Sequence, residues 1–160
     1  MEQQKRKSIR LKNWDYSNNG AYFVTICTQD RLHILCEICR GGALLLPIGD
    51  ICKAQISEFE QRYPIRIDKY VIMPNHIHMI IIVNKEREEQ SPSPTLADII
   101  CAFKSITTKL SNQKDNIKGR KIWQRSYHDH IIRNEQEHKK ICQYIDTNPL
   151  KWELDCYHVK

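Results

Sequence analysis

The chain has 160 residues, 41% of them hydrophobic, and 25 Lys and Arg against 19 Asp and Glu give a net charge of +6. This composition suits one compact domain over residues 1–160 and excludes a membrane-spanning protein, because the longest apolar run, residues 79–83, is far too short to cross a bilayer. The basic N-terminus lacks the apolar core of a signal peptide, and the seven Cys, an odd number, argue against a disulfide framework, so we expect a cytoplasmic protein.

The N-terminal part of the chain predicts a basic arm, a strand and a helix. Residues 1–15 form the arm. Residues 20–28, Gly-Ala-Tyr-Phe-Val-Thr-Ile-Cys-Thr, follow an Asn-Asn-Gly turn and are rich in β-branched and aromatic side chains, which favours a strand. Apolar residues then recur at helical spacing from Pro47 to just before Pro64, which predicts an amphipathic helix packed on the sheet.

A hairpin with two histidines follows. Residues 65–73 alternate apolar and polar side chains as a strand, residues 74–75 form a turn, and residues 76–83 return as the antiparallel partner. Because strand side chains alternate between faces, His76 and His78 should point the same way. Two neutral imidazoles could then bind a divalent metal, leaving coordination positions open for substrate and water. The alternative is a pair of buried, hydrogen-bonded histidines.

The next segment predicts an insertion and a second helix. Residues 85–94 are charged and contain Ser-Pro-Ser-Pro, which indicates a flexible insertion, because neither side is long enough for two separate cores. Thr95 can cap the helix that follows. An apolar stripe along this helix predicts that it also covers the sheet; the stripe consists of Leu96, Ile99, Ile100, Phe103, Ile106 and Leu110.

The C-terminal part predicts two short extended pieces, a helix and a tail. The extended pieces are residues 121–123 and 127–133, and the tail is residues 150–160. Asn134 should begin the last helix, with Glu137 in the capping-box position.

Positive charge is concentrated between residues 104 and 125, where seven Lys and Arg accompany one acid, Asp115. Clustered cations beside Trp123 and Tyr127 favour nucleic-acid binding, in which phosphates are neutralised and bases stack on aromatic faces. The alternative is an ordinary solvated helix face and loop.

Two tyrosines have polar neighbours that could matter for chemistry. Tyr144 and Asn148 are four residues apart, so a helix places them on one face, although periodicity alone favours a core role for Tyr144 and helix termination for Asn148. Tyr127 is a candidate nucleophile, because it lies beside His128 and His130, either of which could serve as a base. If that segment is a strand, both histidines face one side, and we expect a structural role with His130 buried against backbone. No partner is evident for His33, His138 or His158, which we expect at the surface.

Four segments in order resemble the REP-associated tyrosine transposases, relatives of the single-tyrosine HUH transposases of bacterial insertion sequences of the IS200 type. They are residues 20–28, Met-Pro-Asn-His-Ile-His (73–78), Ile-Trp-Gln-Arg-Ser-Tyr-His-Asp-His-Ile-Ile-Arg-Asn (122–134) and Tyr-Ile-Asp-Thr-Asn-Pro (144–149). The resemblance extends over nearly the whole chain, from Ile9 to Trp152, and the ordered combination is far more specific than any single motif.

The resemblance implies an α+β fold in which helices pack on a ferredoxin-like antiparallel sheet with the HUH strand central. It also implies that Tyr144 is the nucleophile and that His76, His78 and Asn148 hold Mg²⁺ or Mn²⁺. The insertion-sequence relatives usually carry Gln at the last of these positions. For DNA contacts, we expect Lys104, Lys109, Arg120 and Arg125 to bind phosphates and Trp123 to stack on bases.

The activity implied is metal-dependent cleavage and strand transfer of single-stranded DNA with foldback hairpins, through a covalent 5′-phosphotyrosine, in a bacterial cytoplasm. The bond energy is stored in the covalent link, so no nucleotide cofactor is needed. The enzyme could act as a homodimer or as a monomer. Two other readings stay open: a noncatalytic DNA or RNA hairpin-binding module with a vestigial metal site, and a hydrolytic metal nuclease in which water attacks.

Overall fold

A computed structural model describes residues 20–39, 42–84 and 94–158. The predicted basic arm of residues 1–15 and nearly all of the predicted insertion of residues 85–94 lie outside these ranges. Within the described ranges, no helix is long and apolar enough to cross a membrane.

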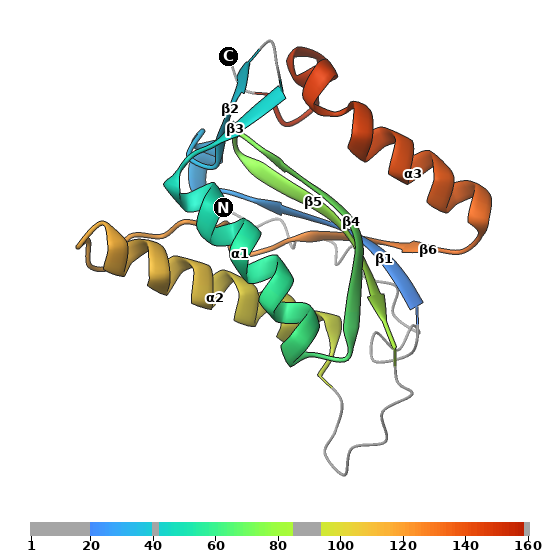
Figure 1. Ribbon diagram of the computed structural model, residues 1–160, viewed down its shortest axis with the longest axis horizontal. Coiled ribbons are helices and arrows are strands. Elements are labelled where there is room, and N and C mark those ends of the chain that lie inside the picture. The colour runs from blue at the N-terminus through green and yellow to red at the C-terminus, as the bar shows by residue number, and fades with distance from the viewer. Residues whose placement is uncertain (1–19, 40–41, 85–93, 159–160) are drawn as a thin grey trace, which may run out of the picture.

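One four-stranded antiparallel sheet organises the molecule (Figure 1). Its strands are β1 (Gly20–Cys27), β4 (Ile65–Met73), β5 (His76–Val83) and β6 (His128–Ile132), in the order β4-β5-β1-β6. With the two helices that follow β1 and β5, this is the β-α-β-β-α-β pattern of ferredoxin-like folds. The predicted fold class is therefore confirmed, with the histidine strand β5 in the interior of the sheet.

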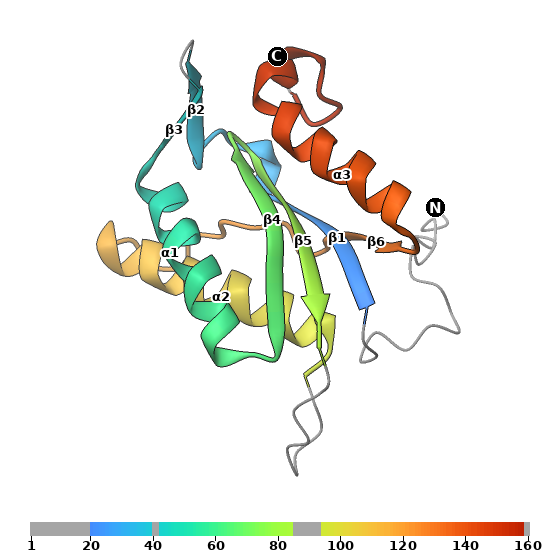
Figure 2. The ribbon, with the colours of Figure 1, turned by 45° about the vertical axis from the view of Figure 1, so that its right-hand side comes forward.

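Helices cover both faces of the sheet (Figure 2). Two of them, α1 (Pro47–Arg62) and α2 (Leu96–Lys114), lie on one face, and α3 (Glu135–Thr147) lies on the other. The main core forms under α1 and α2, because alternate residues of β1 and β5 point that way. It consists of aliphatic and aromatic side chains that include Tyr22, Val24, Ile26, Phe59, Ile77, Met79, Ile81 and Phe103. β5 is buried along almost its whole length, as expected for an apolar run covered on both faces.

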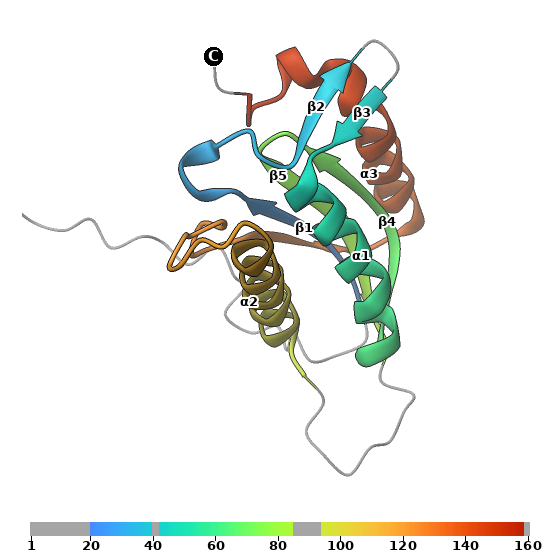
Figure 3. The same cartoon turned by 60° about the vertical axis from the view of Figure 1, so that its left-hand side comes forward.

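The sequence missed a small second sheet and a 3-10 helix at the start of the predicted tail. Strands β2 (Cys36–Cys39) and β3 (Gly42–Leu45) pair as an antiparallel ribbon, and Figure 3 shows this ribbon above α1. The predicted tail begins with a 3-10 helix, η2 (Pro149–Leu154), because Trp152 is buried; another 3-10 turn, η1, spans Gln29–Arg31. The predicted extended piece at residues 121–123 contributes only an isolated bridge between Trp123 and Thr28.

The helix starts follow the predicted caps. The Thr95 hydroxyl accepts from the Asp98 backbone N–H and the Asp98 carboxylate accepts from Thr95, which completes a capping box. The Asn134 side chain caps α3 by accepting from the Glu137 N–H. The Glu137 carboxylate binds the Arg133 N–H instead of returning to Asn134, so this cap is not reciprocal.

The apolar stripe of α2 is correct only for its first turns. Leu110 is 36% exposed, whereas Thr107 and Ser111 are fully buried. Each of these hydroxyls donates to the carbonyl one turn earlier, and Thr107 also accepts from the indole N–H of Trp123. Internal hydrogen bonds thus allow polar residues to occupy the buried face.

Candidate active site

His76 and His78 lie on the face of the sheet covered by α3. The register pairs His76 with Cys27 and His78 with Thr25, and both imidazoles are buried, with 0% and 1% exposure. Their ring centroids are 4.4 Å apart. The period-two alternation of the strand thus brings both rings to one site, as predicted.

Neighbouring side chains fix the orientation of both imidazoles. Nδ1 of His76 lies 2.8 Å from Oδ1 of Asn75, and Nδ1 of His78 lies 2.8 Å from Oγ1 of Thr25. Because an amide oxygen only accepts, Nδ1 of His76 must donate, which leaves the lone pair on Nε2. Nε2 of His76 is buried and has no partner among the described residues. A lone pair without a partner in a polar, buried position is suited to a metal ion.

Burial keeps both histidines neutral. Desolvation, together with the charge of His78, holds the pKa of His76 far below its usual range. Desolvation also lowers the pKa of His78 from 6.5 to about 4. Neutral imidazole is the form that binds metals, so these nitrogens are available at neutral pH.

Helix α3 brings Tyr144 and Asn148 to the same place. The Tyr144 hydroxyl lies 3.2 Å from Nε2 of His78, although 66 residues separate them in the chain. Asn148, the C-cap residue of α3, is 3% exposed, and its Oδ1 is a second buried atom without a partner among the described residues. Tyr144 is 40% exposed, so the expectation of a core role for it is wrong.

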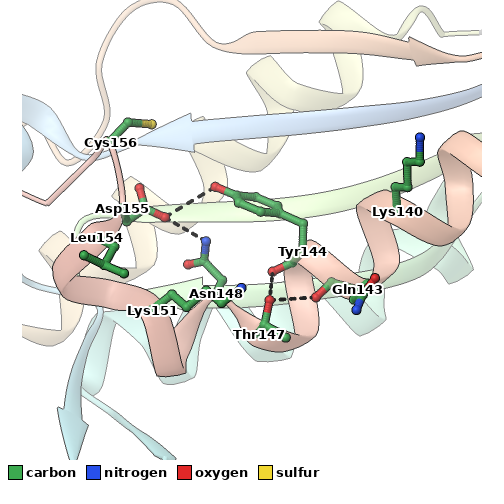
Figure 4. Close-up of a pocket in the computed structure, with 9 residues that line it drawn as sticks. All are labelled: Lys140, Gln143, Tyr144, Thr147, Asn148, Lys151, Leu154, Asp155 and Cys156. Atoms are coloured by element: carbon green, nitrogen blue, oxygen red, sulfur yellow. Dashed lines mark hydrogen bonds between the residues drawn. The ribbon is translucent and has the colours of Figure 1, made fainter.

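A cavity of about 550 Å³ opens beside Tyr144 (Figure 4). Figure 4 shows the phenol and the Asn148 amide both reaching Asp155, while Lys140 extends from the preceding turn of α3. The lining comes from α3, η2 and the residues after η2; it consists of Lys140, Gln143, Tyr144, Thr147, Asn148, Lys151, Leu154, Asp155 and Cys156. Two lysines thus flank an exposed phenol.

Asp155 is a site residue that the sequence did not reveal. Its Oδ2 accepts from the Asn148 amide at 2.7 Å and from the Tyr144 hydroxyl at 3.4 Å. Asp155 offers a carboxylate oxygen within 4.8 Å of a nitrogen of each histidine. Burial alone would raise its pKa, but the N–H of Tyr157, the Asn148 amide and the histidines lower it, so Asp155 is ionised. It lies in the predicted tail, where no spacing rule indicates a contact.

The Tyr144 phenol is protonated at neutral pH. Burial and the charge of Asp155 raise its pKa further above 10. A nucleophile in this state needs its negative charge stabilised as it attacks.

Two predicted DNA contacts are engaged in contacts within the protein. Trp123 is 7% exposed and donates to Thr107, so its face is not available for base stacking. The Lys104 ammonium donates to the carbonyls of Gln124 and Ser126 and holds that loop on α2.

The other predicted DNA contacts do not line the cavity. Lys109 and Arg125 are exposed, on α2 and in the loop after it. Arg120 pairs with Asp115 at 2.7 Å. The cations of α2 thus lie on the side of the sheet away from the histidine pair (Figure 2). The loop after α2 runs beside the end of β1, where the Gln124 N–H donates to the carbonyl of Cys27.

The remaining histidines and Tyr127 have other neighbours. Tyr127 packs on the main core with its ring 5.5 Å from the Lys104 ammonium. The register places His128 and His130 on one face, as predicted, but His130 is exposed and bonds Glu137 rather than backbone, because β6 is an edge strand. His138 is bonded to Asp68 at 2.7 Å, so the expectation that it has no partner is wrong.

The other two isolated histidines have an aromatic neighbour. The rings of His33 and His158 lie against Trp152. The expectation of surface positions holds for His33, which is exposed, whereas His158 is half-buried.

Comparison with known proteins identifies the family. The model of the family described as "Transposase IS200 like" matches residues 22–148. The chain belongs to this family. A Haemophilus influenzae protein described as uncharacterized is 34% identical over 96% of this chain and 93% of its own length. The REP-associated tyrosine transposase of Escherichia coli K12 is 23% identical over 85% of this chain and 70% of its own.

A solved structure of another protein has the same fold as this chain. That structure is of a REP-associated tyrosine transposase bound to a REP hairpin. Its TM-score to this chain is 0.59 at 21% identity, and the match covers 90% of this chain and 74% of that chain. The resemblance to REP-associated tyrosine transposases is therefore confirmed at the level of family and fold.

The residues of this transposase fit a divalent metal. Nε2 of His76 and Oδ1 of Asn148 are buried atoms without partners in the described part of the chain, and Nε2 of His78 lies 3.2 Å from the Tyr144 hydroxyl. Two imidazoles, an amide oxygen and the nearby carboxylate of Asp155 form a donor set that Mg²⁺ and Mn²⁺ accept when oxygens of substrate and water complete the octahedron.

Proposed function

We propose that this transposase cleaves and rejoins single-stranded DNA through a covalent link between Tyr144 and a 5′ phosphate. The juxtaposition of the Tyr144 hydroxyl with Nε2 of His78 carries the proposal, because a phenol at the mouth of a cavity beside two neutral imidazoles has the parts of a nucleophile and its metal site.

His76, His78 and Asn148 would hold Mg²⁺ or Mn²⁺, with Asp155 as a further oxygen donor. The metal would polarise the scissile phosphate and neutralise its developing charge. Thr25 and Asn75 orient the imidazoles from behind, as outer-shell partners do in metal sites. The Tyr144 hydroxyl would release Nε2 of His78 when that nitrogen becomes a ligand.

In the cleavage step, the oxygen of Tyr144 forms a bond to phosphorus, and the bond between phosphorus and the 3′ oxygen breaks. The proton lost by the phenol balances the proton gained by the departing 3′ hydroxyl. Asp155 accepts a hydrogen bond from the phenol and orients it before attack. The freed 3′ hydroxyl can later attack the phosphotyrosine, which restores a phosphodiester without a nucleotide cofactor.

Two lysines are placed to hold the strand at this site. Lys140 and Lys151 line the cavity on either side of Tyr144 along α3 and η2. A cation pairs with a phosphate without regard to sequence, so these residues suit the DNA backbone. We keep Lys109, Arg120 and Arg125 as candidate contacts for a more distant part of a hairpin. A folded-back DNA hairpin long enough to reach both groups of cations would explain why positive charge occurs on both sides of the sheet.

A labelled hairpin oligonucleotide with a single-stranded flank, incubated with Mn²⁺, tests the proposal. We expect a protein–DNA adduct that survives denaturing electrophoresis in the wild type and in Tyr127→Phe, but not in Tyr144→Phe. The Tyr127 variant is the matched control, since it removes the hydroxyl of the rival nucleophile. An adduct that persists in Tyr144→Phe would refute the assignment.

The same assay separates the alternative functions. Free 5′-phosphate ends without attached protein would indicate a hydrolytic nuclease. Hairpin binding without cleavage under any divalent metal would indicate a noncatalytic binding module. Gel filtration with multi-angle light scattering, with and without the hairpin, would decide between monomer and dimer.

A further inference from the structure

A second group of metal-ligating side chains lies between α3 and β4, away from the nucleophile site. It consists of Asp68 on β4 and of His138 and Cys142 on α3. One ligand atom from each lies within 4.8 Å of the other two, and all three residues are half-buried. We propose that these residues form a zinc site that fastens the tyrosine helix to the sheet.

The helix presents two of the ligands with suitable spacing. His138 and Cys142 are four residues apart, so they lie one above the other on one face of α3. Sγ of Cys142 is 3.7 Å from Nε2 of His138. On tetrahedral zinc, with Zn–S of about 2.3 Å and Zn–N of about 2.0–2.1 Å, these atoms lie about 3.6 Å apart. The two side chains thus already have the separation that the ion requires.

A β-bulge supplies the third ligand. The register of β4 on β5 slips between Ile67 and Lys69, so Asp68 is the extra residue. Bulges re-aim side chains, and here the carboxylate of Asp68 reaches α3, where Oδ2 lies 2.7 Å from Nε2 of His138. On tetrahedral zinc, an imidazole nitrogen and a carboxylate oxygen that both bind the ion lie about 3.3 Å apart. A shift of about 0.6 Å would therefore admit the ion.

The surrounding charges leave the site free for a cation. Lys69, next to Asp68, is held by Asp146 at 2.6 Å, and Lys139, next to His138, is held by Glu135 at 2.7 Å. Arg66 binds the other oxygen of Asp68, which leaves Oδ2 toward His138. A thiolate, an imidazole and a carboxylate are typical zinc ligands, and water would complete the tetrahedron.

The site would stabilise the docking of α3. Ile145 is the only residue described for this helix that is fully buried, so few apolar contacts hold α3 to the sheet. A bond from His138 and Cys142 through zinc to Asp68 would cross this interface near its middle. If the proposed function of Tyr144 holds, the same bond would set how rigidly the nucleophile is presented.

Cobalt substitution tests the site directly. With the purified chain and Co²⁺, we expect a thiolate-to-cobalt charge-transfer band in the near ultraviolet, because a Cys is a ligand here and no Cys is among the metal ligands proposed beside Tyr144. The band should vanish in Cys142→Ser and weaken in His138→Ala. It should persist in Cys101→Ser, which alters an exposed Cys of α2, and in Cys156→Ser, which alters the Cys of the cavity.

Zinc affinity and helix protection give independent readouts. Competition against a chromophoric chelator should show that Cys142→Ser lowers the affinity for one equivalent of zinc by more than about 100-fold. Loss of an outer-shell partner alone lowers metal affinity by about 10–100-fold, and loss of a ligand should cost more. Zinc should also slow amide hydrogen exchange in α3 of the wild type but not of Cys142→Ser. Circular dichroism would verify that the variant is folded.

Absence of the cobalt band in the wild type, its persistence in Cys142→Ser, or its loss in Cys156→Ser would each overturn the zinc site. None of these results bears on the phosphotyrosine adduct, which is measured separately. Conversely, a wild-type protein that forms no DNA adduct should still show the cobalt band, so that result would refute only the proposed function.

Discussion

Replacing Thr25 with Val removes the hydroxyl that orients His78 while keeping the shape of the side chain. Oγ1 of Thr25 lies 2.8 Å from Nδ1 of His78, and Thr25 is 3% exposed. A buried polar group left without its hydrogen-bond partner costs about 1–3 kcal/mol, so the variant should lose stability of that order. Loss of an outer-shell partner should also weaken Mn²⁺ binding by about 10–100-fold, or about 1.4–2.8 kcal/mol.

The matched control is Thr107→Val. Thr107 is fully buried in α2, which covers the other face of the sheet, and its hydroxyl accepts from Trp123 and donates to Phe103. This variant should lose similar stability, measured by urea unfolding, with Mn²⁺ affinity unchanged.

Mn²⁺ affinity is measured by the electron paramagnetic resonance signal of the free ion, with adduct formation as a second readout. Equal Mn²⁺ affinity in Thr25→Val and Thr107→Val would refute the reasoning. It would mean that the orientation of His78 does not depend on Thr25, or that His78 is not a ligand.

Three further predictions follow from the packing and the titration of buried groups. Gly49→Ala should destabilise the protein by about 1–3 kcal/mol in urea unfolding, although Ala normally favours a helix, because the new Cβ would lie 2.0 Å from the carbonyl oxygen of Leu35. Ile145→Ala should cost about 2–5 kcal/mol and speed amide exchange in α3 more than in α2, and uniform exchange would contradict the loose docking of α3. Without metal, stability should be full above pH 6.5 and fall as the pH drops below 6.5, because unfolded His76 and His78 take up protons that the folded forms resist. His78 alone contributes a loss of at most about 3–4 kcal/mol, and a flat profile from denaturant melts would contradict the prediction.

Local rules predicted the elements and half of the site. Alternation along a strand is enough to place His76 and His78 on one face, and helical spacing is enough to place Tyr144 and Asn148 one turn apart. The chain order of strands and helices fits the ferredoxin-like sheet that the family resemblance implied. These features depend on neighbours within one or two turns, which a sequence displays directly.

Long-range packing decided the rest. The sequence could not show that α3 covers the face bearing the histidines, that Asp155 returns to the phenol, or that a bulge at Asp68 reaches His138, 70 residues away. It also misassigned Trp123, because an aromatic residue among lysines looks like a stacking platform until the core buries it. The sequence by itself determined which side chains share a face; the tertiary structure decided which faces meet, because that depends on the burial of apolar surface summed over the whole chain.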